Sequence, residues 1–257
     1  MPLKTTSYDD LVAHLAALGL VRGDDVLVQS RLTSFGVIDG GVETVYRALR
    51  DRVGLQGTIV VPTYRLGAPA DEVYDRSASP SLEVGVLSEY VRTLPEAVRS
   101  NCPFHSHAAV GPKAYLLESA SGEASFGPGS DFALLHDNGF INLMLGCNFR
   151  TAGTFVVHVT AMAGNIPYRG WAEFARKRRS ADGRVTSMVC CYYRREDLDV
   201  EEDLEIVEVA LRAAGHLHER PCLYGKSMLV SLADIQAIEL DMLASDPRAI
   251  QAKTTVP

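Results

Sequence analysis

Residues 25–41 read DVLVQSRLTSFGVIDGG, a short apolar run followed by a polar segment that carries glycines. The run from Asp25 to Ser30 has the length and the valine content of a buried strand. Residues Val42 to Val53 follow with apolar side chains at helical spacing, at Val42, Val45, Leu49 and Val53. The stretch therefore predicts a strand, a loop and a helix in succession, the repeating unit of an α/β fold.

The loop of this unit lies where an α/β protein binds phosphate groups. Free backbone N–H groups and the positive end of the following helix can hold an anion. Ser30, Thr33 and Ser34 add hydroxyl donors, and Arg31 adds positive charge. The pattern is neither GxGxxG nor GxxxxGK followed by Ser or Thr, so the loop is not a common dinucleotide or ATP loop. From the residues alone, a tight strand–helix connection with solubilising polar residues is the favoured interpretation.

The rest of the chain alternates helix and strand signals. The segment 65–80 is polar and contains prolines, so we expect a loop there. Because strands and helices alternate, we expect a single α/β domain over residues 1–257, a layered sheet flanked by helices. The expected helices cover residues 7–18, 87–94, 204–214 and 233–243, and the expected strands cover 57–62, 108–111, 140–147, 186–193 and 228–232.

Composition narrows the class of protein. The 257 residues are 47% hydrophobic and 22% charged, as in ordinary globular proteins. The net charge of −7 lacks the basic excess of a nucleic-acid binder, and it suits an amine substrate as well as simple solubility. The five cysteines show no CxxC spacing. With no signal-peptide pattern and no apolar run near the roughly 20 residues of a membrane span, we expect a cytoplasmic protein that contacts neither membrane nor nucleic acid.

Among the seven histidines, His158 has the clearest chemical interest. It lies in the apolar segment 154–164, TFVVHVTAMAG. An imidazole among apolar neighbours costs free energy unless a partner satisfies it or a reaction uses it. Near its ordinary pKa, imidazole is the natural general base at neutral pH. A core histidine with a hydrogen-bond partner is the competing interpretation.

The segment 99–107, RSNCPFHSH, contains further candidates. His105 and His107 have the spacing of two metal ligands on a strand, but no third ligand lies at a diagnostic distance, so we expect no metal. Cys102 beside His105 or His158 offers a thiol nucleophile for covalent transfer. A buried cysteine is more commonly inert packing.

Six segments in register resemble one family, the aminoglycoside 3-N-acetyltransferases, which differ from the GNAT acetyltransferases. The family patterns are V-L-V-H-S-S-L-S-S-L-G then G-G, G-T-L-V-M-P-T, R-S-x-H-P-x-x-S-x-A-A-x-G, P-x-G-x-x-S, L-L-L-G, and T-x-x-H-x-x-E then P-x-R. The matching segments of this chain are residues 26–41, 57–63, 99–111, 125–130, 143–146, and His158 with residues 167–169. Their order and spacing hold from about residue 8 to about residue 247.

The resemblance implies transfer of an acetyl group from acetyl-coenzyme A to an amine, by direct attack and without a metal. Ser106 would lie near the pantetheine end or the thioester, and His158 would take a proton from the attacking amine, which is mostly ammonium at neutral pH. Cys102 and His105 complete the catalytic candidates. The residues expected to line the coenzyme A site are Ser30, Arg31, Leu32, Ser34, Phe35, Gly36, Val37 and Ser106.

The chain departs from the family pattern where the chemistry is concentrated. Ala161 stands at the family glutamate, Cys102 at the family histidine before proline, and Arg31 at a family serine. Thr154 lies four residues before His158 rather than three. Loss of the glutamate removes a partner that fixes the histidine tautomer, and negative charge that would hold a polycation.

Several functions stay open on this basis. The leading hypothesis is N-acetylation of an amino sugar or another small amine, with Glu173 or Asp131 as replacement acids. The others are aminoglycoside acetylation for antibiotic resistance, a coenzyme A-binding module without catalysis, and acyl transfer through Cys102. The expected partner is a small-molecule amine, and a homodimer is left open.

Overall fold

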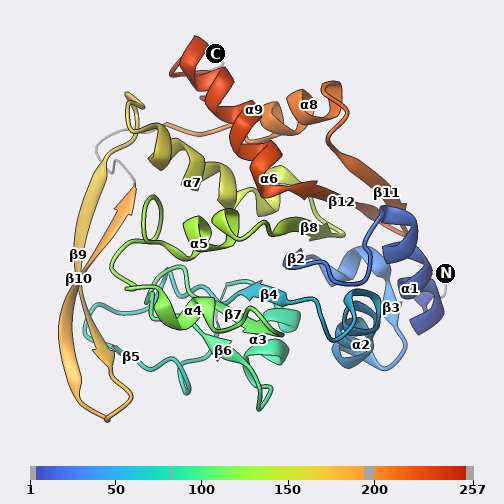
Figure 1. The fold of residues 1–257 in the computed structure, drawn as a ribbon, viewed down its shortest axis with the longest axis horizontal. Helices are drawn as coiled ribbons and strands as arrows, with labels where there is room; N and C mark the ends of the chain where they lie inside the picture. The colour runs from blue at the N-terminus through green and yellow to red at the C-terminus, as the bar shows by residue number, and fades with distance from the viewer. Residues whose placement is uncertain (1–3, 82, 194–199, 253–257) are drawn as a thin grey trace.

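The computed structural model describes residues 4–81, 83–193 and 200–252 (Figure 1). Its helices are α1 (Tyr8–Leu18), η1 (Leu32–Phe35), α2 (Gly41–Val53), α3 (Val86–Arg92), α4 (Leu116–Ser119), α5 (Asp131–Asp137), α6 (Phe149–Ala152), α7 (Thr154–Ala163), α8 (Glu205–Ala213) and α9 (Leu232–Ser245). Its strands are β1 (Thr5–Thr6), β2 (Val26–Ser30), β3 (Val37–Ile38), β4 (Ile59–Pro62), β5 (Val73–Tyr74), β6 (Val98–Arg99), β7 (His107–Val110), β8 (Ile141–Leu145), β9 (Trp171–Arg179), β10 (Val185–Tyr193), β11 (His218–Cys222) and β12 (Gly225–Ser231).

A seven-stranded mixed sheet forms the centre, in the order β11-β12-β8-β2-β4-β7-β6. The three middle strands, β8, β2 and β4, are parallel, and the flanking pairs are antiparallel. The parallel strands therefore end at the same edge of the sheet. The expected α/β fold with a layered sheet is confirmed.

Both faces of the sheet are covered by helices, because its central strands are apolar on both sides. Val26 and Val28 of β2 pack with helices α1, α2 and α3, whereas Leu27 packs with α5, α7 and α9. In Figure 1, α7, α8 and α9 lie above the sheet and α2 and α3 lie below it. The strand–loop–helix unit at residues 25–53 is thus built into a three-layer core.

Local sequence signals explain where α1 begins and ends. Ser7 and Asp10 form a reciprocal capping box, and Gly19 ends the helix with φ of 109°, a conformation that favours glycine. Leu11, Leu15 and Leu18 are all buried, so the helical spacing seen in the sequence marks the face that packs on the sheet.

The segments around β5 and β9 differ from expectation. Residues 65–80 are not only loop, because β5 pairs with β9, which pairs in turn with β10 in a long hairpin at the left of Figure 1. Residues 176–179 form a basic run on β9. Arg176 lies 4.3 Å from the centre of the Phe104 ring, and Arg179 pairs with Asp75. Long arginine side chains can cover apolar surface while their charge stays near water.

Glu239 on α9 is fully buried, and neither carboxyl oxygen has a hydrogen-bond partner within the described ranges. Burial raises its pKa well above the usual 4.5. The folded protein therefore keeps this proton while the unfolded chain loses it above pH 4.5, so stability falls as pH rises from there. We expect Glu239→Gln to raise the melting temperature at about pH 8 and to match the wild type near pH 4.5. A constant difference at all pH values would contradict this, and Glu118→Gln, at an exposed site, is the control.

Candidate active site

A cleft of about 460 Å³ opens at the edge where the three parallel strands end. Ligands of open α/β sheets bind at such carboxyl ends, where connections leave in opposite directions. The N-terminal residue of α7, Thr154, also faces the cleft. The cleft is lined by Gln29, Ser30, Arg31, Pro62, Tyr64, Leu66, Glu83, Val84, Gly85, Cys147, Thr151, Ala152 and Thr154.

The residues predicted to bind coenzyme A divide into two groups. Ser30 and Arg31 line the cleft. Ser34 and Phe35 are only 4% and 2% exposed and face the interior. The Ser34 hydroxyl donates a hydrogen bond to the Gly146 carbonyl at 2.6 Å, so Ser34 and Phe35 hold the loop in place.

The other predicted loop residues, Leu32, Gly36 and Val37, have structural contacts of their own. Val37 pairs with Thr5 in the small β1–β3 sheet, and Leu32 packs at the edge of the core under α1 and α2. Gly36 has φ of 71°, and a Cβ there would lie 2.3 Å from the Lys4 carbonyl oxygen. These three residues shape the loop, and their part in coenzyme binding stays a prediction.

Gln29 was not predicted as a site residue, yet it lines the inner wall of the cleft. Its side chain is 6% exposed, and its Oε1 has no hydrogen-bond partner among the described residues. A buried acceptor without a donor costs free energy, so a rotation of the side chain toward the cleft would let this oxygen accept from an N–H group of a bound ligand. The available signal was one polar residue inside the apolar run at 25–30.

His158 lies on α7, one helical turn after Thr154, and is 1% exposed. The Gly127 backbone N–H donates to its Nδ1 at 3.1 Å, so the proton of the neutral ring is on Nε2. Burial lowers its pKa to about 3. The imidazole is therefore neutral at physiological pH, and its lone pair faces Gly127.

An aromatic cluster joins His158 to the two histidines of the 99–107 segment. The Phe132 ring lies 5.9 Å from His158 and 4.8 Å from His107. The Phe126 ring lies 4.6 Å from His105 and stacks on Phe132. The structure thus gathers three imidazoles on one face of the sheet, of which the sequence singled out His105 and His158 for catalysis.

Asp131 was expected to replace the family glutamate as the acidic partner of His158, but it contacts a different histidine. Its Oδ2 lies 2.9 Å from His107 Nδ1 and accepts a hydrogen bond from the Ser100 hydroxyl at 2.5 Å. Glu173, the other candidate, is exposed on β9. The buried carboxylate–imidazole pair of this region is therefore Asp131 with His107.

Ser106 and Cys102 lie away from the cleft lining. Ser106 is fully buried, and its hydroxyl donates to the Thr63 carbonyl at 2.8 Å. Cys102 is 2% exposed, and burial raises the pKa of its thiol to about 12. Because the thiolate is the nucleophile, this surrounding disfavours covalent transfer through Cys102. Within the described ranges, no three His, Cys, Asp or Glu side chains are placed to share a metal ion.

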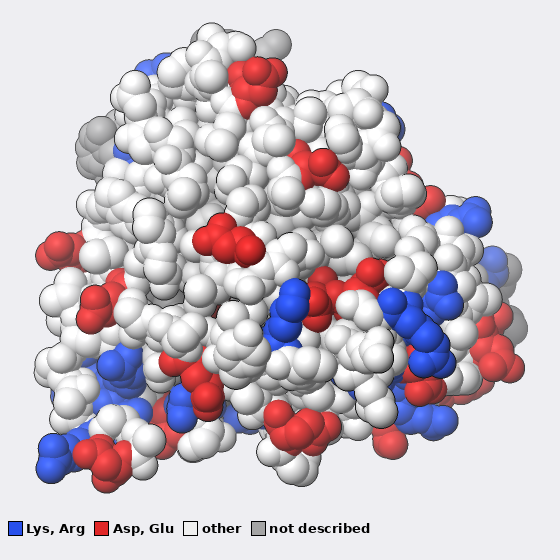
Figure 2. Space-filling view, viewed as in Figure 1, with Lys and Arg blue, Asp and Glu red and all other residues white. Residues whose placement is uncertain are grey.

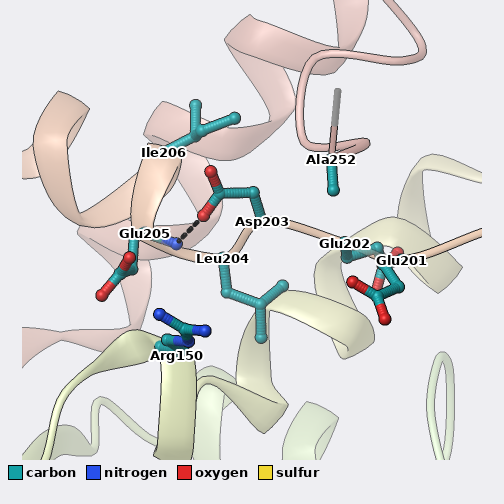
Figure 3. Close-up of a pocket in the computed structure, with 8 residues that line it drawn as sticks. All are labelled: Arg150, Glu201, Glu202, Asp203, Leu204, Glu205, Ile206 and Ala252. Atoms are coloured by element: carbon teal, nitrogen blue, oxygen red, sulfur yellow. Dashed lines mark hydrogen bonds between the residues drawn. The ribbon is translucent and has the colours of Figure 1, made fainter. Parts of the chain in front are cut away.

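A second, larger cavity of about 850 Å³ borders α6 on another side (Figure 3). Figure 3 shows Arg150 facing a segment of acidic residues, in which the Asp203 carboxylate accepts from the Glu205 backbone N–H at 3.1 Å. Glu202, also in its wall, is bound to Arg169. The described residues of its lining include no histidine, cysteine, serine or tyrosine, so the cleft at the strand ends is the better candidate for the active site.

Charged side chains are unevenly distributed over the face shown in Figure 2. Figure 2 shows acidic and basic side chains interspersed over the lower part of the face, while the part above the sheet is mostly uncharged with isolated acidic residues. No helix within the described ranges is long and apolar enough to span a bilayer.

The fold is shared with a solved acetyltransferase. The acetyltransferase AAC-IIIb, solved with coenzyme A, superposes with a TM-score of 0.82 at 26% identity, over 94% of this chain and 97% of that one. Fold and cleft thus define an α/β protein of the N-acetyltransferase class. The aminoglycoside 3-N-acetyltransferase family pattern matches residues 27–244, and the chain belongs to this family.

Two curated relatives agree with the family. The chain is 35% identical to aminoglycoside N(3)-acetyltransferase VII of Streptomyces paromomycinus, over 80% of both proteins. It is also 35% identical to aminoglycoside N(3)-acetyltransferase VIII of Streptomyces fradiae, where the match spans 60% of each protein. The resemblance drawn from the sequence segments is confirmed.

Proposed function

We propose that this chain is an enzyme that transfers the acetyl group of acetyl-coenzyme A to a primary amine of an amino sugar or another small amine. The observation that carries the proposal is the cleft at the parallel strand ends, which is lined by Ser30, Arg31 and Gln29. The buried Gln29 Oε1 has no hydrogen-bond partner among the described residues. The cationic loop suits the phosphates of the coenzyme, and the amide oxygen suits an N–H donor. Relatives named as N(3)-acetyltransferases support the same reaction.

Direct attack of the amine on the thioester needs no covalent enzyme intermediate. The amine nitrogen bonds to the carbonyl carbon, the C–S bond breaks, and the coenzyme leaves as the thiol after taking a proton. The raised thiol pKa of Cys102 favours this route over acyl transfer through Cys102.

His158 enters this reaction as a neutral buried imidazole. As general base it must offer a lone pair, and in the described geometry that lone pair accepts from Gly127. The base role therefore requires the ring to exchange this hydrogen bond. In the geometry described, Nε2–H is a donor suited to the developing oxyanion.

Aminoglycoside acetylation remains the second candidate, because the relatives carry that name. Ala161 replaces the carboxylate of the family pattern, and Glu83 is the single acidic residue among the described residues that line the cleft. This charge balance favours an amine with fewer positive charges than an aminoglycoside. We further infer a single domain over residues 1–257 that acts in the cytoplasm, with a homodimer as its candidate assembly.

Thermal unfolding with acetyl-coenzyme A, coenzyme A and ATP tests the proposal. A ligand at about 100 times its dissociation constant stabilises the folded state by about 2.7 kcal/mol. We expect both coenzyme A species, but not ATP, to raise the melting temperature, and amine-dependent release of the free thiol to follow. Coenzyme binding without turnover of any amine would instead support a non-catalytic module.

A further inference from the structure

A chain of buried polar groups leads from the cleft into the protein. Tyr64 follows β4 and lines the cleft, and its hydroxyl lies 3.4 Å from Nε2 of His107. Nδ1 of His107 lies 2.9 Å from Oδ2 of Asp131. His107 is 0% exposed and Asp131 is 3% exposed, so both depend on polar contacts within the protein, with each other and with Ser100.

The hydrogen bonds set the direction in which a proton can move along these polar groups. The Asp131 carboxylate accepts, so the proton of a neutral His107 is on Nδ1 and its lone pair is on Nε2. That lone pair faces the Tyr64 hydroxyl, which donates to it. A proton that reaches Tyr64 from the cleft can therefore be passed to His107, and the resulting imidazolium is stabilised by the adjacent carboxylate.

His158 has the opposite arrangement. Its lone pair accepts from the Gly127 N–H at 3.1 Å, and its proton is on Nε2. No carboxylate of the described residues forms a hydrogen bond with the ring. Since the family glutamate is Ala161 here, the carboxylate–imidazole pair lies at His107 instead. Both imidazoles contact Phe132, so they belong to the same region of the core.

We propose that Tyr64 is a catalytic residue that accepts the proton of the attacking amine and passes its own proton to Nε2 of His107, with Asp131 as the positioning residue. The inference rests on the proposed acetyl transfer. The N–C bond forms as the C–S bond breaks, and the proton lost by nitrogen moves to the Tyr64 oxygen. The hydroxyl proton moves to His107, and the same path returns a proton to the departing thiolate.

Gln29 lies in the wall of the same cleft, and its buried Oε1 has no hydrogen-bond partner among the described residues. A rotation of this side chain toward the cleft would let the amide oxygen accept one N–H of the amine. The amine would then be held by one hydrogen bond while its other proton is removed through Tyr64.

Steady-state kinetics of Tyr64→Phe tests the relay. We expect kcat to fall by about 100-fold or more, with the KM for acetyl-coenzyme A changed less than about twofold. Tyr46→Phe, a buried tyrosine on α2, is the matched control and keeps wild-type kcat. A Tyr64→Phe enzyme with wild-type kcat overturns the relay while leaving acetyl transfer intact.

Nitrogen NMR of the histidine rings tests the relay without any turnover. We expect His107 as the Nδ1–H tautomer and His158 as the Nε2–H tautomer, with the His107 signals assigned by their loss in His107→Gln. Tyr64→Phe shifts the His107 Nε2 resonance, because its hydrogen-bond donor is gone. A His107 ring protonated on Nε2 overturns the relay whether or not an amine substrate is known. Absence of wild-type turnover with a correct tautomer overturns the acetyl transfer instead.

Discussion

Replacement of His158 by alanine is expected to lower kcat for acetyl transfer by about 10²–10⁴-fold, the range typical of a lost acid–base group or oxyanion donor. The imidazole is buried one helical turn after Thr154, a residue of the cleft. Water from the solvent therefore does not replace its function in the alanine variant. Coenzyme binding should survive, because Ser30 and Arg31 lie on a different element. Thermal shift with coenzyme A and initial rates on the same sample separate the two effects.

A glutamine at position 158 distinguishes the two candidate roles of the imidazole, general base and hydrogen-bond donor to the oxyanion. Glutamine retains an N–H donor but cannot take a proton at neutral pH. If His158 donates to the oxyanion, kcat of His158→Gln should be at least about tenfold higher than kcat of His158→Ala. Equal rates for the two variants would return the base role to His158. His216→Ala, an exposed histidine paired with Asp234, is the control for loss of an imidazole.

The parts of the fold that were predicted correctly depend on local information. The apolar run that became β2, and the capping residues of α1, act within a few residues of chain. The β9–β10 hairpin was only half predicted, because residues 176–179 of β9 are four charged residues in succession and hide the alternation typical of a strand. The mixed sheet was not predictable in this way, since strand pairing joins residues as distant as Leu143 and Leu229.

The candidate site shows the same limit. Ser30 and Arg31 were predicted to bind the coenzyme and do line the cleft, because a loop after a buried strand must emerge at the sheet edge. Tyr64 and Gln29 were missed because each follows or interrupts an apolar run and has no motif of its own. The contact between His107 and Asp131 depends on how α5 packs on the sheet, which no spacing in the sequence reveals.

Phe132 connects these histidines, and we expect Phe132→Ala to lower the free energy of unfolding by about 3–5 kcal/mol, the usual loss for a buried phenylalanine. The ring is 0% exposed and lies in the middle of the aromatic cluster. This is a large share of the roughly 5–15 kcal/mol that keeps a domain folded. Urea unfolding with an unchanged slope measures it, and a loss below about 1 kcal/mol would show that the ring is not packed as described.

Phe132→Leu separates the stability of the core from the chemistry, because leucine fills most of the volume and the fold should survive. We expect it to lower kcat as well, since the ring contacts His107 at 4.8 Å and His158 at 5.9 Å and fixes the orientation of both. Phe140→Leu is the matched control, as Phe140 is 1% exposed in the same core and packs against Lys113 rather than an imidazole. If both variants lose stability equally but only Phe132→Leu loses kcat, the aromatic cluster orients the histidines for the reaction; equal kcat in the two variants would limit Phe132 to packing.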